Sequence, residues 1–89
     1  QGAIVAELRA AHVKVRILAD QGEGIPDLLC GFRRRISLLE VKNPETENPL
    51  KPRAALTEAQ VEFFDEWAGF PIHIVFTPKQ ALEAIGVRT

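Results

Sequence analysis

The charged residues of one short stretch have the types and spacing of a metal site. Asp27 follows Pro26 and opens the apolar run "DLLCGF", while Glu40 and Lys42 lie two apart at the end of "ISLLEVK". Both runs are typical of β-strands, in which alternate side chains share a face, so Glu40 and Lys42 point the same way, about 7 Å apart. A hairpin that turns near Arg34 would place Asp27 opposite them. The spacing therefore predicts two carboxylates and one ammonium on one face of a sheet.

Adjacent carboxylates repel, so one of them must take up a proton or both must share a cation. Oxygen ligands suit Mg²⁺ or Mn²⁺, which bind through one or two carboxylates and a substrate phosphate. A neighbouring lysine can orient the attacking water or stabilise the charge that develops on phosphorus. Each half alone also has a structural explanation, with Pro26-Asp27 as turn chemistry and Glu40-x-Lys42 as a surface ion pair. Their combination beside buried leucines favours the metal site.

The surrounding sequence predicts a single α/β domain over residues 1–89. Helical and alternating apolar patterns indicate a helix, three strands, a helix, a strand and a helix. Three consecutive strands are expected to pair antiparallel, and the fourth, after a helical crossover, to add in parallel. The fourth strand is expected in the centre of this mixed sheet because it is apolar nearly throughout. The predicted elements cover residues 3–12, 13–17, 27–32, 36–42, 57–69, 71–77 and 78–85, with a proline-containing loop over 43–56.

Composition restricts the setting and the partners. Of the 89 residues 46% are hydrophobic, enough for a buried core, and no stretch is long enough to cross a bilayer or reads as a signal peptide. The lone Cys30 gives no internal disulfide and no zinc cluster, so a reduced, intracellular setting is expected. Because the chain begins with Gln1 and not with methionine, native N-terminal residues are expected upstream. The net charge of −1 argues against a nucleic-acid partner, although basic residues gather near the predicted hairpin and loop.

The motif residues resemble a known family. "GIPD" followed by "LLEVK" is similar to the PD-(D/E)xK nuclease motif, and "LTEAQ", a helix, "GFPIHIVF" and a last helix resemble its VRR-NUC branch of small standalone viral nucleases. The resemblance covers nearly the whole chain and implies a restriction-endonuclease-like mixed sheet flanked by helices. It further implies that Asp27, Glu40 and the main-chain carbonyl of Val41 bind the metal and that Lys42 is catalytic.

Two further positions follow from the same resemblance. Gln60 matches the glutamine of the family's L-T-x-x-Q signature, which supports the site from the second helix. It also lies three residues after Thr57, where a capping box would give it a purely local role. Family members carry an acidic residue on the first helix, which this chain lacks in that place. Gln1 shares the buried face of that helix and is the expected site residue there, with the acid upstream of the chain.

Other residues have competing interpretations. Arg33, Arg34 and Arg35 are expected either to grip DNA phosphates or to form a solvated turn, and Lys51 and Arg53 are expected to contact DNA from the loop. His73 and Cys30 are expected to be packing residues. The simplest expectation for the aromatic residues of the second helix is burial in the core, with a dimer surface around Phe63 and Phe70 as the alternative. The second-helix residues concerned are Phe63, Phe64 and Trp67.

Together these features predict a Mg²⁺- or Mn²⁺-dependent endonuclease that hydrolyses DNA phosphodiester bonds. So small a domain has little room to read base sequence, so the expected substrate is recognised by shape, as in branched DNA or a Holliday junction. The resemblance implies a homodimer of phage or prokaryotic origin that acts inside the cell. The alternative is a nuclease-like module that binds DNA or assembles without cutting, and RNA cleavage is a third possibility.

Overall fold

The computed structural model describes residues 1–88 and has an α/β fold, as the sequence predicts. One four-stranded mixed sheet has the strand order β1-β2-β3-β4. β1 pairs antiparallel with β2, β2 pairs antiparallel with β3, and β4 lies parallel to β3. The elements are α1 (Gly2–Ala10), β1 (Lys14–Ile17), β2 (Leu28–Phe32), β3 (Arg35–Val41), the 3₁₀ turn η1 (Pro52–Ala55), α2 (Glu58–Glu66), β4 (Ile72–Val75) and α3 (Pro78–Ile85).

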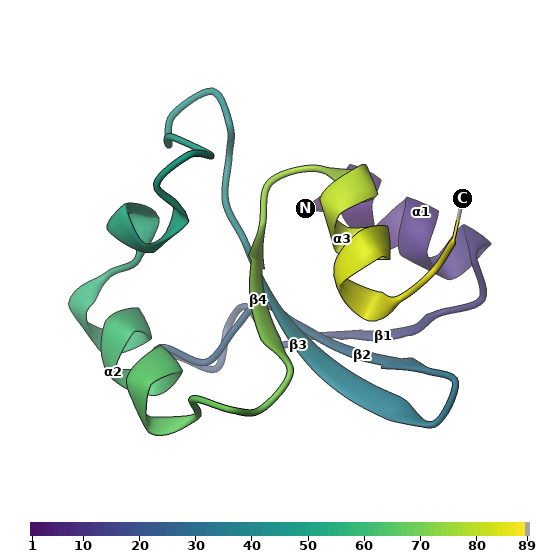
Figure 1. Ribbon diagram of the computed structural model, residues 1–89, viewed down its shortest axis with the longest axis horizontal. Coiled ribbons are helices and arrows are strands. Elements are labelled where there is room, and N and C mark those ends of the chain that lie inside the picture. The colour runs from purple at the N-terminus through teal and green to yellow at the C-terminus, as the bar shows by residue number, and fades with distance from the viewer. Residues whose placement is uncertain (89) are drawn as a thin grey trace.

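The helices lie on two sides of the sheet. Figure 1 shows α1 and α3 side by side on one face, while α2 and the loop that precedes it lie on the other side. The principal core fills the space under α1 and α3. Its members are Ile4, Val5, Leu8, Val13, Leu28, Cys30, Leu39, Val75, Ala81, Leu82 and Ile85.

The β2–β3 hairpin has a two-residue turn made of Arg33 and Arg34. Phe32 pairs with Arg35, and the two turn residues have φ angles of 49° and 68°. Positive φ at both central positions is the feature of a type I′ turn, whose twist matches that of the strands. The register that follows pairs Leu28 with Leu39 and so brings the start of β2 beside the end of β3.

The predicted central position of the fourth strand is wrong, because β4 lies at the edge of the sheet next to β3. The sequence of β4 is apolar because other elements pack on both faces of the strand, and not because a strand lies on each side of it. Val75 is buried in the core under α1 and α3. Alternation places Ile72 and Ile74 on the opposite face, where Phe64 of α2 lines the same hollow.

The predicted burial of the α2 aromatic residues is correct only for Phe64. Phe63 is half-buried, and Trp67 and Phe70 are 39% and 62% exposed. The rings of Phe63 and Trp67 stack, with centroids 5.4 Å apart, because residues four apart lie on the same side of a helix. That side of α2 lines a hollow together with Glu23 and Ile25 of the loop before β2. Among residues 1–88, no helix has the length and apolar character required to cross a membrane.

Candidate metal centre

The hairpin register places Asp27 beside the end of β3. Asp27 directly precedes Leu28, whose partner is Leu39, so its carboxylate lies next to Glu40 and Val41. One carboxylate oxygen, Oδ2, accepts a hydrogen bond of 2.9 Å from the backbone N–H of Val41. Because the N–H and C=O of one strand residue point to the same side, the Val41 carbonyl also faces Asp27. The structure thus brings together the three residues that the resemblance assigns to the metal.

Lys42 lies beside Glu40 on the same face of β3. Its Nζ is 3.5 Å from Glu40 Oε2 and donates a 2.9 Å hydrogen bond to Gln60 Oε1. The Lys42 side chain is only 15% exposed, so both contacts are shielded from bulk water. The ammonium is therefore fixed between the end of β3 and the start of α2.

Gln60 combines the two roles that the sequence left open. Its Oε1 accepts from the backbone N–H of Thr57 at 2.9 Å, and its own N–H donates to Thr57 Oγ1, which completes a capping box. The same side chain donates from Nε2 to Glu40 Oε2 at 3.2 Å and accepts from Lys42. The N-terminus of α2 thus orients both charged groups of the centre.

Gly24 allows α2 to approach this closely. Its φ is 74°, and a Cβ at this position would overlap the Ala59 carbonyl and lie 2.9 Å from the backbone nitrogen of Gln60. Only glycine combines this conformation with such a close backbone contact. This contact joins the loop before β2 to the helix that carries Gln60, far apart in sequence.

Glu40 is the least satisfied polar group of the centre. It is 2% exposed, and its Oε1 is buried without a hydrogen-bond partner. Burial, together with the neighbouring carboxylate of Asp27, raises the pKa of Glu40 to about 7, and Lys42 offsets only part of this effect. A buried carboxylate oxygen without a donor costs free energy, and either a proton shared with Asp27 or a bound cation would remove that cost.

The residues present fit a hard divalent cation. No group of three or more His, Cys, Asp or Glu side chains that could hold a metal occurs among residues 1–88. Asp27, Glu40 and the Val41 carbonyl would supply the protein oxygens. That number suits Mg²⁺, which usually keeps several waters and binds through one or two carboxylates plus substrate phosphates. The chemistry of the donor set and the unpartnered Glu40 oxygen both agree with such an ion.

A hollow of about 480 Å³ opens at this end of the sheet. Asp27, Val41 and Lys42 line it together with Gln1, which has the N-cap position of α1 but makes no side-chain capping bond. Gln1 is exposed, so its predicted place on the buried face of the helix is wrong. The structure nevertheless places Gln1 beside the centre, and its role as a site residue stays a prediction. Pro78 at the start of α3 lines the same hollow, so the N-termini of α1 and α3 both border it. The carboxylates of Asp27 and Glu45 line it as well, so its walls carry charges of both signs.

The predicted DNA contacts are not gathered around this opening. Arg33, Arg34 and Arg35 lie at the tip of the hairpin, at the opposite end of β3 from Glu40. Lys51 is exposed in the loop before α2. Arg53 forms a 2.8 Å ion pair with Asp65 and lies over the Phe64 ring, so its charge is partly neutralised.

His73 and Cys30 have the environments expected of packing residues. His73 is half-buried in β4, and burial lowers its pKa. Cys30 is buried in the core, where desolvation raises the pKa of the thiol to about 11. A thiol of this kind is a poor nucleophile, and neither residue lines the hollow at the metal centre.

The two roles of Gln60 can be separated by a matched pair of variants. Thr57→Ala removes a capping hydroxyl but leaves the contacts of Gln60 to Glu40 and Lys42, and we expect it to lower the free energy of unfolding by about 1 kcal/mol. Gln60→Ala should cost a similar amount and, if the centre binds a divalent cation, should also weaken that binding by about 10–100-fold, as loss of a group that orients a metal ligand does. Urea unfolding measures the first effect and titration with Mn²⁺ the second. Equal affinity of the two variants for Mn²⁺ would restrict Gln60 to its capping role.

Comparison of the chain with protein-family models, with curated proteins and with solved structures finds no match in any of the three. The case for function therefore depends on the geometry of the centre and on the residues that resemble the nuclease motif.

Proposed function

We propose that the chain is a Mg²⁺- or Mn²⁺-dependent nuclease that hydrolyses phosphodiester bonds of DNA. The observation that carries this proposal is the buried, unpartnered Oε1 of Glu40, next to the carboxylate of Asp27 and the ammonium of Lys42. A purely structural ion pair would need only one carboxylate. Two carboxylates with one open oxygen support a centre for a cation. Asp27 and Lys42 also line the neighbouring hollow, which would give a phosphate access to them.

Each residue of the centre has a distinct part in this chemistry. A bound divalent ion would activate the attacking water and stabilise the charge on the leaving oxygen. Asp27 and Glu40 would hold the ion, and the N–H of Val41 fixes the orientation of Asp27. Lys42, held by Gln60, presents its positive charge to the phosphate oxygens as negative charge develops on them.

The preferred substrate, partner and setting extend this proposal. The domain offers few elements for reading base sequence, so branched DNA is the substrate that we infer, including Holliday junctions. A homodimer acting inside a phage-infected or prokaryotic cell would place two such centres on opposed strands. The alternative is a module that binds DNA or assembles without cutting it. The small number of protein ligands within residues 1–88 favours this alternative.

The test is a cleavage assay on labelled junction, flap, linear duplex and RNA substrates with Mg²⁺, Mn²⁺ or EDTA. We expect DNA products with Mn²⁺ and none with EDTA. Asp27→Asn tests the charge of this residue alone, because its amide oxygen can still accept the hydrogen bond from Val41. This variant should abolish cleavage. Gel shifts without products for every metal would overturn the nuclease proposal in favour of a binding module, and RNA products alone would change the substrate.

A further inference from the structure

The charges of the chain are strongly segregated, although they nearly cancel in total. Residues 8–19 and 28–39 hold six of the 11 lysines and arginines and none of the 12 acidic residues. The sheet brings these two segments together, because β1 pairs with β2 and β2 continues into the hairpin. We name the result the basic surface, which consists of Arg9, Lys14, Arg16, Arg33, Arg34 and Arg35, all of them exposed.

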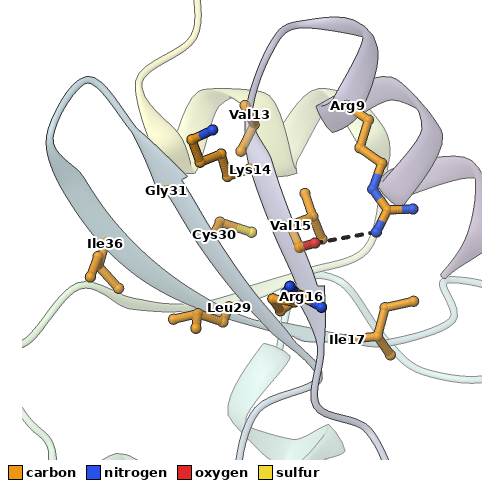
Figure 2. A pocket seen from close by; sticks show the side chains of 10 residues that line it. All are labelled: Arg9, Val13, Lys14, Val15, Arg16, Ile17, Leu29, Cys30, Gly31 and Ile36. Carbon is orange, nitrogen blue, oxygen red and sulfur yellow. Dashed lines mark hydrogen bonds between the residues drawn. The ribbon is translucent and has the colours of Figure 1, made fainter.

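The basic surface borders two neighbouring hollows. One, of about 880 Å³, runs along β1 and contains Arg9, Lys14 and Arg16 (Figure 2). The other, of about 400 Å³, lies at the hairpin tip and contains the three consecutive arginines. Lys14 and Ile36 line both hollows, so the surface is continuous, and no aspartate or glutamate lines either of them.

No acidic partner neutralises this surface. Within residues 1–88, the two ion pairs are Lys42 with Glu40 and Arg53 with Asp65, and neither involves a residue of the basic surface. Arg9 donates one hydrogen bond of 3.2 Å to the Val15 carbonyl. Six exposed cations without an anion nearby repel one another, and a polyanion would relieve that repulsion.

The hairpin turn provides an independent indication. Both central positions of a type I′ turn favour Asn-Gly, because the positive φ is strained for residues with longer side chains. This chain has Arg33 and Arg34 there, with φ angles of 49° and 68°. Backbone strain at a turn tip is expected where a side chain serves a function that a better turn former could not. The function these two side chains share is positive charge.

The position of the basic surface distinguishes it from the candidate metal centre. Arg35 and Glu40 are the first and sixth residues along β3, and at the rise of a strand they are about 17 Å apart. A ligand that contacts both regions must be long and carry charge along its length. A nucleic-acid duplex has one negative charge per about 1.7 Å of its axis and can meet many cations at once.

We propose that the basic surface binds the phosphate backbone of a nucleic-acid duplex at a distance from the candidate metal centre. The identity of this ligand rests on the proposed nuclease function, whereas the binding itself needs neither metal nor cleavage. An acidic protein segment would use the same charges, but it would not supply regularly spaced anions along both hollows.

The experiment is fluorescence anisotropy of a labelled 24-base-pair duplex in EDTA, titrated at several salt concentrations. Replacing Arg33-Arg34 by Asn-Gly removes two charges and relieves the strain of the turn. We expect binding to weaken about ten-fold and the slope of log Kd against log salt to fall by about 1.8. The melting temperature should rise by about 5 °C, so weaker binding could not reflect a damaged fold. Lys14→Gln with Arg16→Gln should lower the slope similarly.

The control is Arg33→Lys with Arg34→Lys, which keeps the charge and should bind within about two-fold of wild type. An unchanged salt slope in the Asn-Gly and Lys14/Arg16 variants would overturn the proposal, as would loss of binding in the lysine variant. Binding of poly-L-glutamate but not of the duplex would overturn it in favour of an acidic protein partner. If cleavage fails but charge-dependent binding persists, only the nuclease proposal is wrong. If the protein cleaves DNA but its binding does not depend on these charges, only the proposal for the basic surface is wrong.

Discussion

Replacing Lys42 by methionine should lower metal-dependent cleavage about 100–1,000-fold while the protein remains folded. Methionine keeps an unbranched apolar stem against the sheet but removes the ammonium that contacts Glu40 and Gln60. The loss should occur in kcat, because the charge on the phosphate oxygens that Lys42 meets is larger in the transition state than in the bound substrate. Single-turnover cleavage at saturating DNA measures this effect directly.

The matched control for this variant is Lys51→Met, which removes the same charge from the exposed loop before α2. A residue that only contacts DNA should change KM or salt dependence by less than ten-fold and leave kcat nearly unchanged. Lys42→Met also leaves Glu40 without its positive neighbour, so unfolding curves must show that both variants are fully folded in the assay. If Lys42→Met cleaves at the wild-type rate, the ammonium has only a structural role as the partner of Glu40.

Local patterns were sufficient to predict that Asp27, Glu40 and Lys42 lie together, because this geometry depends on strand alternation and on one hairpin. Asp27 and Glu40 meet because a two-residue turn fixes the register, and Lys42 follows Glu40 on the same face. The capping role of Gln60 was also readable, since Thr57 lies three residues before it. The alternation of residues along a strand does not show which backbones approach each other. The contact of Gly24 with α2 could not be predicted in this way, because it joins a loop and a helix that are far apart in sequence.

The expectations that failed concern the arrangement of elements and not their existence. An apolar strand such as β4 has the same pattern whether strands or only helices lie beside it, so its edge position was not visible. A helix cannot turn all of its aromatic residues toward the core. In α2, Phe64 is buried and Trp67 is exposed. The basic surface was missed in part because Arg9, Lys14 and Arg16 become neighbours of the hairpin arginines only through strand pairing.

Replacing Glu40 by glutamine should stabilise the metal-free protein at pH 8 and abolish its response to metal. Burial raises the pKa of Glu40 to about 7 in the folded protein, above its ordinary value of 4.5. A raised pKa means that the fold binds this proton more tightly than the unfolded chain does. The corresponding stability is fully present below about pH 4.5 and is lost as the pH rises through 7.

The size of the effect follows from the same linkage. In EDTA, the free energy of unfolding of the wild type should fall between pH 4.5 and 8 by on the order of 3 kcal/mol because of this group alone. Glutamine carries no charge to desolvate, so the variant should lack this fall and should exceed the wild type by about that amount at pH 8. Urea unfolding at pH 4.5, 6, 7 and 8 measures both curves.

A bound metal should make the wild type more stable than the Glu40→Gln variant at pH 8. Saturating Mn²⁺, at about 1,000 times its Kd, should stabilise the wild type by about 4.1 kcal/mol, because the ion binds the folded state only. The Glu40→Gln variant lacks one of two carboxylates and should gain almost nothing, and it should not cleave DNA. A variant that is less stable than the wild type at pH 8 in EDTA would mean that Lys42 already satisfies the ionised carboxylate, and that the open oxygen of Glu40 needs no cation.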